Sequence, residues 1–306
     1  MFKGLFTALI TPFKYGALDE EAYIKLIEWQ INSGVHGLVT CGSTGEAQNL
    51  SRTELHRAIE LCVKTVNGRV PVIAGTGSAS TSETIEISNE AKNLGVDGIL
   101  VVTPYYLRPA QEGLYKHYKA INDEVAMPIM IYNVPRRTSV DISDETIIRL
   151  AKLEHIVGLK DATGDLSRIS NIINEVDENF VVFAGDDETA LGFNAQGGAG
   201  CISVVSNIYP SLCAKIQDHW FAGDWGRAFE IQKMLASLFN ILFCETNPVP
   251  IKYAASLFEI CSPDVRLPLV PLSERNKKLI KEAILNTQEK ITEYERYHKE
   301  YSSSKS

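Results

Sequence analysis

Short apolar runs alternate with longer amphipathic segments over the first two thirds of the chain. Runs of this kind, closed by glycine, proline or polar residues, are typical of parallel strands that are buried on both faces. The segments between them carry apolar residues at helical spacing, so a strand and a helix alternate every ~25–30 residues. The eight apolar runs cover positions 5–12, 37–39, 70–74, 98–102, 128–132, 156–160, 180–184 and 200–205.

Capping signals mark where several of these helices begin. Asp19 is placed to cap the first helix, because its carboxylate can accept from the free amides of the first turn. Ser51 with Glu54, and Ser80 with Glu83, have the spacing of capping boxes. In a capping box the two side chains bond to each other's backbone amides, so two further helices are expected directly after these serines.

An alternation of strands and helices implies parallel strand pairing, because each helix returns the chain to the same edge of the sheet. Eight such units close a (β/α)8 barrel more readily than they form an open sheet, so the predicted fold is an α/β TIM barrel. The alternative, an open doubly wound sheet, would have a glycine fingerprint after its first strand. The segment Thr11-Pro12-Phe13 is not such a fingerprint.

After residue 223 the strand pattern stops, and helical patterns cover 225–243, 248–258 and 273–298. This region is too small to be independent, so we expect a helical annex. We predict a catalytic barrel over 1–223 and a C-terminal helical region over 224–306 that packs on the barrel. The last few residues, 301–306, are expected to be disordered.

Composition narrows the class of protein. The chain has 306 residues, 45% of them hydrophobic, and a net charge of -8 with both signs scattered along it, which argues against nucleic acid as a partner. Its six cysteines include no CxxC pair and indicate reduced thiols, not a disulfide framework or zinc site. The first apolar run is too short for a signal sequence, and no segment reaches the ~18–20 apolar residues of a membrane helix. We therefore expect a cytoplasmic protein with no membrane partner.

One lysine lies at the end of a predicted strand. Lys160 closes the sixth apolar run, where an unpaired ammonium group would be costly to bury. An ion pair would offset this cost, although Asp161 is poorly placed because neighbours on a strand point to opposite faces. The other explanation is a neutral amine, its pKa lowered by burial from ~10.4 toward ~7–8, that attacks a carbonyl. Taken alone, this stretch favours the ion pair.

In a barrel, side chains at the carboxyl ends of the strands converge on one face. The inventory there has no histidine pair, no metal-spaced carboxylate cluster and no P-loop, so no metal or cofactor is predicted. His36, His56 and His117 are expected on helices or helix ends, in exposed or capping roles. The residues that follow the strands are mostly hydroxyls, cations and glycine: Ser43, Thr44, Tyr105, Tyr106, Tyr132, Arg137, Lys160, Gly185 and Ile202.

Each of these residues has a plain structural explanation: Tyr132 as a core tyrosine, Arg137 as a surface charge, and 42–45 as a simple turn. Their joint placement after successive strands favours Schiff-base chemistry instead. The amine attacks a ketone, and a proton relay dehydrates the carbinolamine and removes a proton alpha to the iminium, which leaves an enamine. Backbone N–H groups of the 43–45 turn can hold the carboxylate of a 2-oxo acid.

Six motifs together resemble the 4-hydroxy-tetrahydrodipicolinate synthase (dihydrodipicolinate synthase) family in order and spacing, from residue 1 to about residue 285. They are GSTGE at 42–46, TPYY at 103–106, YNVPxRT at 132–138, GLKDATG at 158–164, GDD at 185–187 and NPVPIK at 247–252. The resemblance implies a lyase of bacterial lysine and diaminopimelate synthesis. It also implies a homotetramer built from two tight dimers.

The resemblance assigns catalytic roles to four residues. Lys160 would form the Schiff base with pyruvate. Tyr132, Ser43 and Tyr106 would be the proton-relay hydroxyls, with Tyr106 reaching in from a neighbouring subunit.

It assigns substrate binding to four others. Thr44 would help hold the pyruvate carboxylate, and Arg137 would bind the carboxylate of the second substrate, L-aspartate 4-semialdehyde. Main-chain groups of Gly185 and Ile202 would line the pocket.

The chain departs from the family pattern at several positions. Ser43 stands where threonine is frequent, which keeps the hydroxyl and loses a methyl group. Arg136 replaces what is often a small residue, so the pocket rim is expected to be more basic. In lysine-sensitive members, two histidines and an asparagine occupy the positions of Arg52, Leu55 and Ala79. We therefore expect lysine inhibition to be weak or absent.

Three alternatives remain. N-acetylneuraminate lyase shares the barrel and the lysine but has no arginine at the position of Arg137, so Arg137 and the GDD motif favour the synthase. A 2-keto-3-deoxy sugar-acid aldolase is a further variant on the same scaffold. The alternative from another class is a non-catalytic barrel that binds a metabolite, in which Lys160 is part of a structural ion pair.

Overall fold

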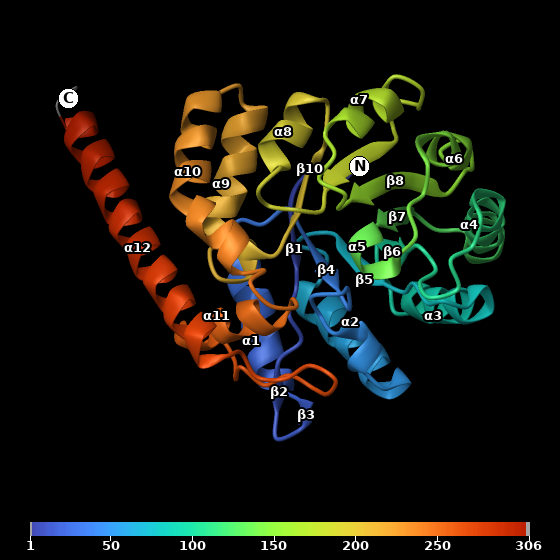
Figure 1. Ribbon diagram of the computed structural model, residues 1–306, viewed down its shortest axis with the longest axis horizontal. Coiled ribbons are helices and arrows are strands. Elements are labelled where there is room, and N and C mark those ends of the chain that lie inside the picture. Colours follow the sequence, from blue (N-terminus) through green and yellow to red (C-terminus); the bar gives the residue numbers. More distant parts are fainter. Residues whose placement is uncertain (1, 304–306) are drawn as a thin grey trace.

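Eight parallel strands close into a barrel that helices surround (Figure 1). The computed structural model describes residues 2–303, with side chains as far as residue 297. The barrel strands are β1 (Gly4–Ala8), β4 (Gly37–Thr40), β5 (Val72–Gly75), β6 (Gly98–Val102), β7 (Ile129–Asn133), β8 (Ile156–Asp161), β9 (Val181–Ala184) and β10 (Gly200–Ser203). They neighbour one another in chain order, and β1 pairs with both β4 and β10. The predicted TIM barrel is confirmed, and the open sheet is wrong.

Helices connect the strands on the outside of the barrel. They are α1 (Glu20–Asn32), α2 (Arg52–Val66), α3 (Thr81–Asn93), α4 (Gln111–Val125), α5 (Pro135–Thr138), α6 (Asp144–Leu150), α7 (Ser167–Ile173), α8 (Ala190–Ala195) and α9 (Pro210–Phe221), with short 3-10 turns η1 (Ala47–Asn49) and η2 (Val205–Asn207). A small antiparallel hairpin, β2 (Phe13–Lys14) and β3 (Ala17–Leu18), follows β1. The sequence analysis missed this hairpin, because two-residue strands have no readable periodicity.

Three helices form the C-terminal region: α10 (Trp225–Ile241), α11 (Val249–Leu257) and α12 (Glu274–Ser303). In Figure 1, α12 lies at the outer edge of the molecule beside α10. Ile280 and Ile284 of α12 are buried, so this helix contributes one face to the core. The helix continues to Ser303, and residues 304–306 of the expected disordered tail lie outside the described residues.

The predicted capping boxes have different outcomes. The box of Ser51 and Glu54 is confirmed, since each side chain bonds to the other's backbone amide. At α3 only half of the box forms: Ser80 accepts from the Glu83 amide at 3.4 Å, but the Glu83 carboxylate binds the Ser78 hydroxyl instead. The prediction of a full box there is wrong, because the folded loop after β5 offers the glutamate a closer partner.

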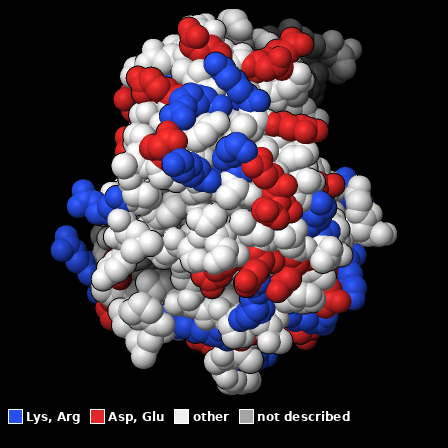
Figure 2. All heavy atoms as spheres, turned by 90° about the vertical axis from the view of Figure 1, so that its right-hand side faces the viewer, with Lys and Arg blue, Asp and Glu red and all other residues white. Residues whose placement is uncertain are grey.

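Surface charge is mixed on the face that Figure 2 presents. Lysine and arginine side chains alternate with aspartate and glutamate, without a continuous basic area on that face. Within the described residues, no helix is both long and apolar enough to cross a membrane.

The barrel interior is packed with apolar side chains below the carboxyl ends of the strands. Phe6 and Phe183 meet there edge to face, with ring centroids 5.3 Å apart. The inward-facing residues of β7 and β8 continue this layer upward, because every second side chain of a strand points to the same face. As a result, Tyr132 and Lys160 lie next to each other on neighbouring strands at the mouth of the barrel.

The expectation of an exposed or capping role is wrong for one histidine. His117 lies inside α4 and is buried against α3, where its Nδ1 atom is 2.9 Å from the Thr81 hydroxyl. Its Nε2 atom has no hydrogen-bond partner among the described residues. Burial lowers the pKa of His117 to about 4, because an imidazolium at this position would lose its hydration.

This burial predicts an acid-sensitive stability. The unfolded chain protonates His117 near its ordinary pKa of 6.5, whereas the folded protein resists protonation until about pH 4. The free energy of unfolding should therefore fall by up to about 3 kcal/mol as the pH drops through this interval. Urea titrations of wild type and His117→Gln should show a flatter acid branch in the variant. His56→Gln, at an exposed position of α2, should keep the wild-type pH dependence, and equal slopes for all three proteins would contradict the prediction.

Candidate active site

Lys160 lies at the centre of the barrel mouth. Its side chain is buried at 6% exposure, and the Nζ atom is 4.4 Å from the centroid of the Tyr132 ring. The ion pairs among the described residues do not include Lys160, and the carboxylate of Asp161 bonds instead to Asn133 and Thr163. The amine is therefore buried without a counter-ion, which argues against the structural ion pair.

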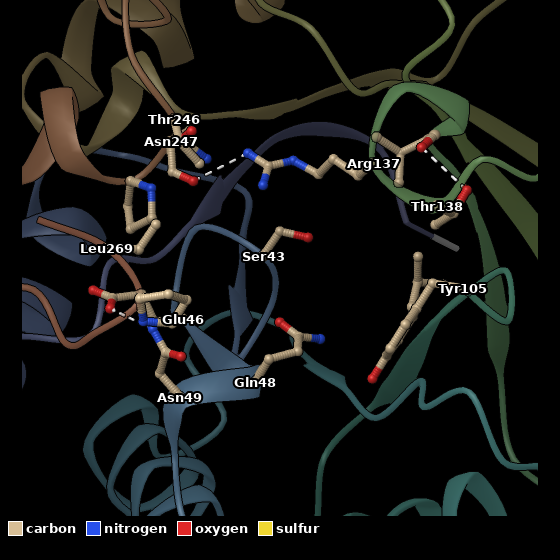
Figure 3. Close-up of a pocket in the computed structure, with 14 residues that line it drawn as sticks. Ser43, Glu46, Gln48, Asn49, Tyr105, Arg137, Thr138, Thr246, Asn247 and Leu269 are labelled. Carbon is tan, nitrogen blue, oxygen red and sulfur yellow. Dashed lines mark hydrogen bonds between the residues drawn. The ribbon is translucent and has the colours of Figure 1, made fainter.

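A cavity of about 330 Å³ opens above Lys160. It brings together six of the eight predicted site residues: Ser43, Thr44, Tyr132, Arg137, Lys160 and Gly185. An adjoining recess of about 270 Å³ shares Ser43 and Arg137 with the cavity and adds Tyr105 (Figure 3). In the figure the guanidinium of Arg137 reaches across the recess above Ser43. The two hollows together can hold a small keto acid and a second substrate.

Two predicted site residues do not line this cavity. Tyr106 is 89% exposed, has a left-handed backbone conformation after β6, and is not among the residues that line the cavity of its own chain. Ile202 is fully buried in β10 and packs inside the barrel, so its side chain does not line the cavity. Tyr105, not Tyr106, lines the recess from within the same chain.

The hydroxyl of Tyr132 is available for chemistry. Tyr132 is buried at 7% exposure, yet its hydroxyl forms no hydrogen bond within the described residues. A buried phenol in a core normally finds a partner, as Tyr118 does by donating to the Val101 carbonyl at 2.9 Å. The explanation of Tyr132 as a satisfied core tyrosine is therefore disfavoured.

The loop after β4 presents Ser43 and Thr44 to the cavity. The Gly45 amide donates to the Gly42 carbonyl at 3.0 Å, so this amide is not free to hold a carboxylate as the sequence suggested. The amides of Ser43 and Thr44 form no hydrogen bond within the described residues. Asn247 Nδ2 donates to Thr44 Oγ1 at 2.9 Å, so the Thr44 hydroxyl proton remains able to donate to an anion.

Two neighbouring arginines on α5 differ in their partners. Arg136 pairs with Asp186 at 2.5 Å, and its guanidinium is 5.7 Å from the centroid of the Phe243 ring. Arg137 donates to the Asn247 carbonyl at 3.1 Å and pairs with no carboxylate among the described residues. Burial raises the pKa of Asp186, and the charges of Arg136 and Lys160 oppose this rise. Arg137 is therefore the cation that an incoming carboxylate can bind.

Gly185 is required by a close approach of the backbone. Its amide donates to the Asp161 carbonyl at 2.6 Å, directly after Lys160 in β8. A Cβ atom at this position would lie 2.7 Å from the Ala162 Cβ atom, closer than packed carbon atoms come. Glycine thus lets the end of β9 press against the end of β8 and shapes the wall beside the amine.

Sequence reasoning missed the part played by Asn247 and Asp186. Both lie in motifs that the resemblance used, but no role was derived for either side chain. Asn247 comes from the segment before α11, outside the barrel strands, so the rule that site residues follow strands could not find it. Arg136 was placed at the rim correctly, and its partner Asp186 became visible only in three dimensions.

Comparison with known proteins gives a consistent result. The model of the dihydrodipicolinate synthetase family matches residues 1–287. The 4-hydroxy-tetrahydrodipicolinate synthase of Parvibaculum lavamentivorans is 55% identical over 273 residues, which is 89% of this chain and 94% of the relative. The synthase of Rhodospirillum centenum is 52% identical over 94% of this chain and 99% of its own length. The solved structure of the synthase from Methylacidiphilum fumariolicum SolV matches with a TM-score of 0.95 at 38% identity, over 97% of this chain and 99% of that one.

Proposed function

The chain belongs to the dihydrodipicolinate synthetase family, and from this premise we propose that it is a 4-hydroxy-tetrahydrodipicolinate synthase, a lyase that condenses pyruvate with L-aspartate 4-semialdehyde. The observation that carries the proposal is a buried lysine without a counter-ion, beside a free phenol and within one cavity with an unpaired arginine. This combination suits a keto acid that bonds to the amine and a second substrate that carries a carboxylate.

The geometry supports a Schiff-base sequence. The Lys160 nitrogen attacks C2 of pyruvate, and the carbinolamine loses water to give an iminium. Loss of a C3 proton to the relay leaves an enamine, whose C3 atom then bonds to the aldehyde carbon of the second substrate. The amino group of that substrate closes the ring by attacking C2, which releases Lys160. Tyr132 and Ser43 move the protons in these steps.

Substrate binding is assigned to groups around the two hollows. The Thr44 hydroxyl and the amides of Ser43 and Thr44 hold the pyruvate carboxylate. Arg137 exchanges its contact with the Asn247 carbonyl for a charge-assisted contact with the carboxylate of the semialdehyde. Main-chain groups of Gly185 line the cavity beside the Schiff base, and we propose that the main chain of Ile202, whose side chain packs inside the barrel, lies next to them.

The remaining assignments concern the assembly and the place of action. We assign Tyr106 to the relay of a neighbouring subunit, because its side chain is exposed and does not line its own cavity. That assignment requires at least a dimer, and we propose a homotetramer built from two such dimers. We also assign 1–223 to the catalytic barrel, 224–306 to a helical region packed on it, and the enzyme to the cytoplasm.

The structure weighs against the alternatives. An N-acetylneuraminate lyase or a sugar-acid aldolase would leave Arg137 without a carboxylate to bind at the mouth of the recess. A metabolite-binding barrel with a structural lysine would need a counter-ion for Lys160 that the described residues do not supply. Turnover of N-acetylneuraminate, with none of the semialdehyde, would reverse the choice among these enzymes.

The proposed function is tested by product formation from pyruvate and aspartate semialdehyde in wild type and Arg137→Ala. The variant loses a charge-assisted contact worth ~1.5–3 kcal/mol, so turnover with the semialdehyde should fall by about 10–150-fold. Formation of the pyruvate adduct should be unaffected. Arg136→Ala is the matched control: its pair with Asp186 is partly exposed, so its loss should change turnover by no more than about fivefold. Wild-type turnover in Arg137→Ala would remove Arg137 from the site.

Inhibition by lysine is expected to be weak or absent. The recess at the expected lysine position has a volume of about 230 Å³ and is lined by Arg52, Glu83 and Tyr105 among others. Arg52 pairs with Glu90 at 2.8 and 2.9 Å, and Glu83 already bonds to the Ser78 hydroxyl. A cationic ligand there would meet a fixed positive charge and an occupied carboxylate. Initial rates with lysine added should stay near the uninhibited value, and half-maximal inhibition at submillimolar lysine would contradict this.

A further inference from the structure

A fully buried ion pair joins α11 to the loop that carries Ser43 and Thr44. Lys252 of α11 is 0% exposed and Glu46 is 3% exposed, and the Nζ and Oε1 atoms are 2.5 Å apart. Taking two charges out of water costs free energy that their attraction does not reliably recover. Such a pair therefore calls for an explanation other than stability.

The Lys252 ammonium group and the second carboxylate oxygen of Glu46 have further partners. Lys252 Nζ donates to the Asp264 carbonyl at 2.9 Å and lies 3.9 Å from the centroid of the Phe13 ring. The second oxygen of Glu46 accepts from the Arg266 amide at 3.3 Å. Burial lowers the pKa of Lys252, and the Glu46 carboxylate opposes this effect. The glutamate is thus held in one position from several sides.

Glu46 also has an unusual backbone conformation. Its φ of 52° places a non-glycine residue in the left-handed region, which the chain adopts only where its surroundings require it. Its amide donates to the Ser43 carbonyl at 3.2 Å, so a shift of Glu46 would also move the backbone of Ser43. The ion pair therefore bears on the shape of the loop that faces the cavity.

The same C-terminal segment reaches the loop at a second point. Asn247 lies five residues before Lys252 and donates to Thr44 Oγ1 at 2.9 Å. Lys252 holds the loop through Glu46, which lines the recess beside Ser43 (Figure 3), while Asn247 contacts the loop at Thr44. Two separate contacts, one ionic and one neutral, determine both the position and the orientation of the loop.

We propose that Lys252 and Glu46 are positioning residues of the reaction, which hold Ser43 and Thr44 at the barrel mouth where they face Lys160. Neither lines the cavity above Lys160, so they act on pyruvate through the loop, although Glu46 also lines the adjoining recess. The inference rests on the proposed function, because the loop must bind the pyruvate carboxylate for its position to matter. It goes beyond that function by assigning a role to Lys252, the last residue of the NPVPIK motif.

The decisive variant is the double replacement Glu46→Leu with Lys252→Met. Apolar residues of similar volume often replace a buried ion pair without loss of stability, so the variant should fold while the ionic hold is removed. We expect the KM for pyruvate to rise by about 10–100-fold. At limiting pyruvate, the rate at which the borohydride-trapped adduct forms should fall by the same factor. The KM for aspartate semialdehyde should change less than the KM for pyruvate, since Arg137 lies on α5 and outside this loop, although Glu46 lines the same recess.

A matched control separates positioning from stability. Asn194→Ala removes a buried hydrogen bond of 2.8 Å to Gln217, between α8 and α9 and outside the cavity lining. It should lower the urea midpoint and leave the KM for pyruvate unchanged. Glu46→Gln is the second test variant, because it keeps the volume and an acceptor for Lys252. It should raise the KM for pyruvate less than the double variant does.

The outcomes are distinct. A folded double variant with wild-type adduct rate and wild-type KM for pyruvate would overturn the proposal. If the double variant does not fold, unchanged pyruvate kinetics in folded Glu46→Gln would overturn it, and a selective rise in the KM for pyruvate would support it. Absence of any pyruvate adduct in the wild type would instead overturn the proposed function on which the inference rests.

Discussion

Replacement of Lys160 by alanine should lower turnover of pyruvate with aspartate semialdehyde by about 10³-fold. That loss corresponds to ~4 kcal/mol of transition-state stabilisation, because the covalent route disappears while binding groups around the cavity remain. The borohydride-trapped adduct with pyruvate should disappear altogether. The amine is the one reacting group in the cavity for which the neighbouring hydroxyls offer no substitute.

The adduct is measured by mass spectrometry of the intact protein after borohydride reduction in the presence of pyruvate. Turnover is measured by initial rates. Lys152→Ala is the matched control, because it removes an exposed lysine just before β8 and should keep both the adduct and the turnover. Peptide mapping should place the wild-type adduct on Lys160. An adduct of equal yield in Lys160→Ala would show that the nucleophile has been wrongly assigned.

The second large effect is expected from Tyr132→Phe, with turnover lowered by about 10²–10³-fold. Loss of a positioned proton donor and acceptor typically has this size. Phenylalanine keeps the ring that packs 4.4 Å from Lys160 Nζ, so the change removes only the hydroxyl. Single-turnover measurements with pyruvate should show that the adduct still forms, but slowly, because dehydration of the carbinolamine has lost its proton source.

Tyr118→Phe is a suitable comparison for this experiment. It also removes one buried phenolic hydroxyl, which donates to the Val101 carbonyl, but it lies on α4 and does not line the cavity. It should cost ~0.5–1.5 kcal/mol of folding stability and leave turnover unchanged. Wild-type single-turnover kinetics in Tyr132→Phe would exclude Tyr132 from the relay.

Much of the fold was predictable because its signals are local. Helix α1 begins directly after Asp19, as predicted, because Asp19 caps it and accepts from the Ala22 amide at 3.1 Å. The strand that carries Lys160 was recognised from its apolar run, and the repeat of such units predicted the closed barrel. The errors lie where a distant group intervenes. His117 was expected to be exposed or to cap a helix. A single polar residue in a helical segment does not indicate whether a neighbouring helix packs on that side of it.

The candidate site was predictable to the extent that barrel geometry itself brings residues together. Side chains that follow different strands meet at the mouth because parallel strands end on one face, and this rule found Ser43, Tyr132 and Arg137. It could not say that the Gly45 amide already has a hydrogen-bond partner, nor that Tyr106 does not line its own cavity. Those facts depend on how each loop is bonded.

The sequence by itself determined the order of strands and helices, the closed barrel and the place of Lys160, because apolar periodicity and capping act over a few residues. Only the tertiary structure decided what surrounds that lysine. Asn247 meets Thr44 across 203 positions of the chain, and Lys252 meets Glu46 across 206. No local pattern encodes contacts at such a distance, since they arise only when the C-terminal helices pack against the loop after β4.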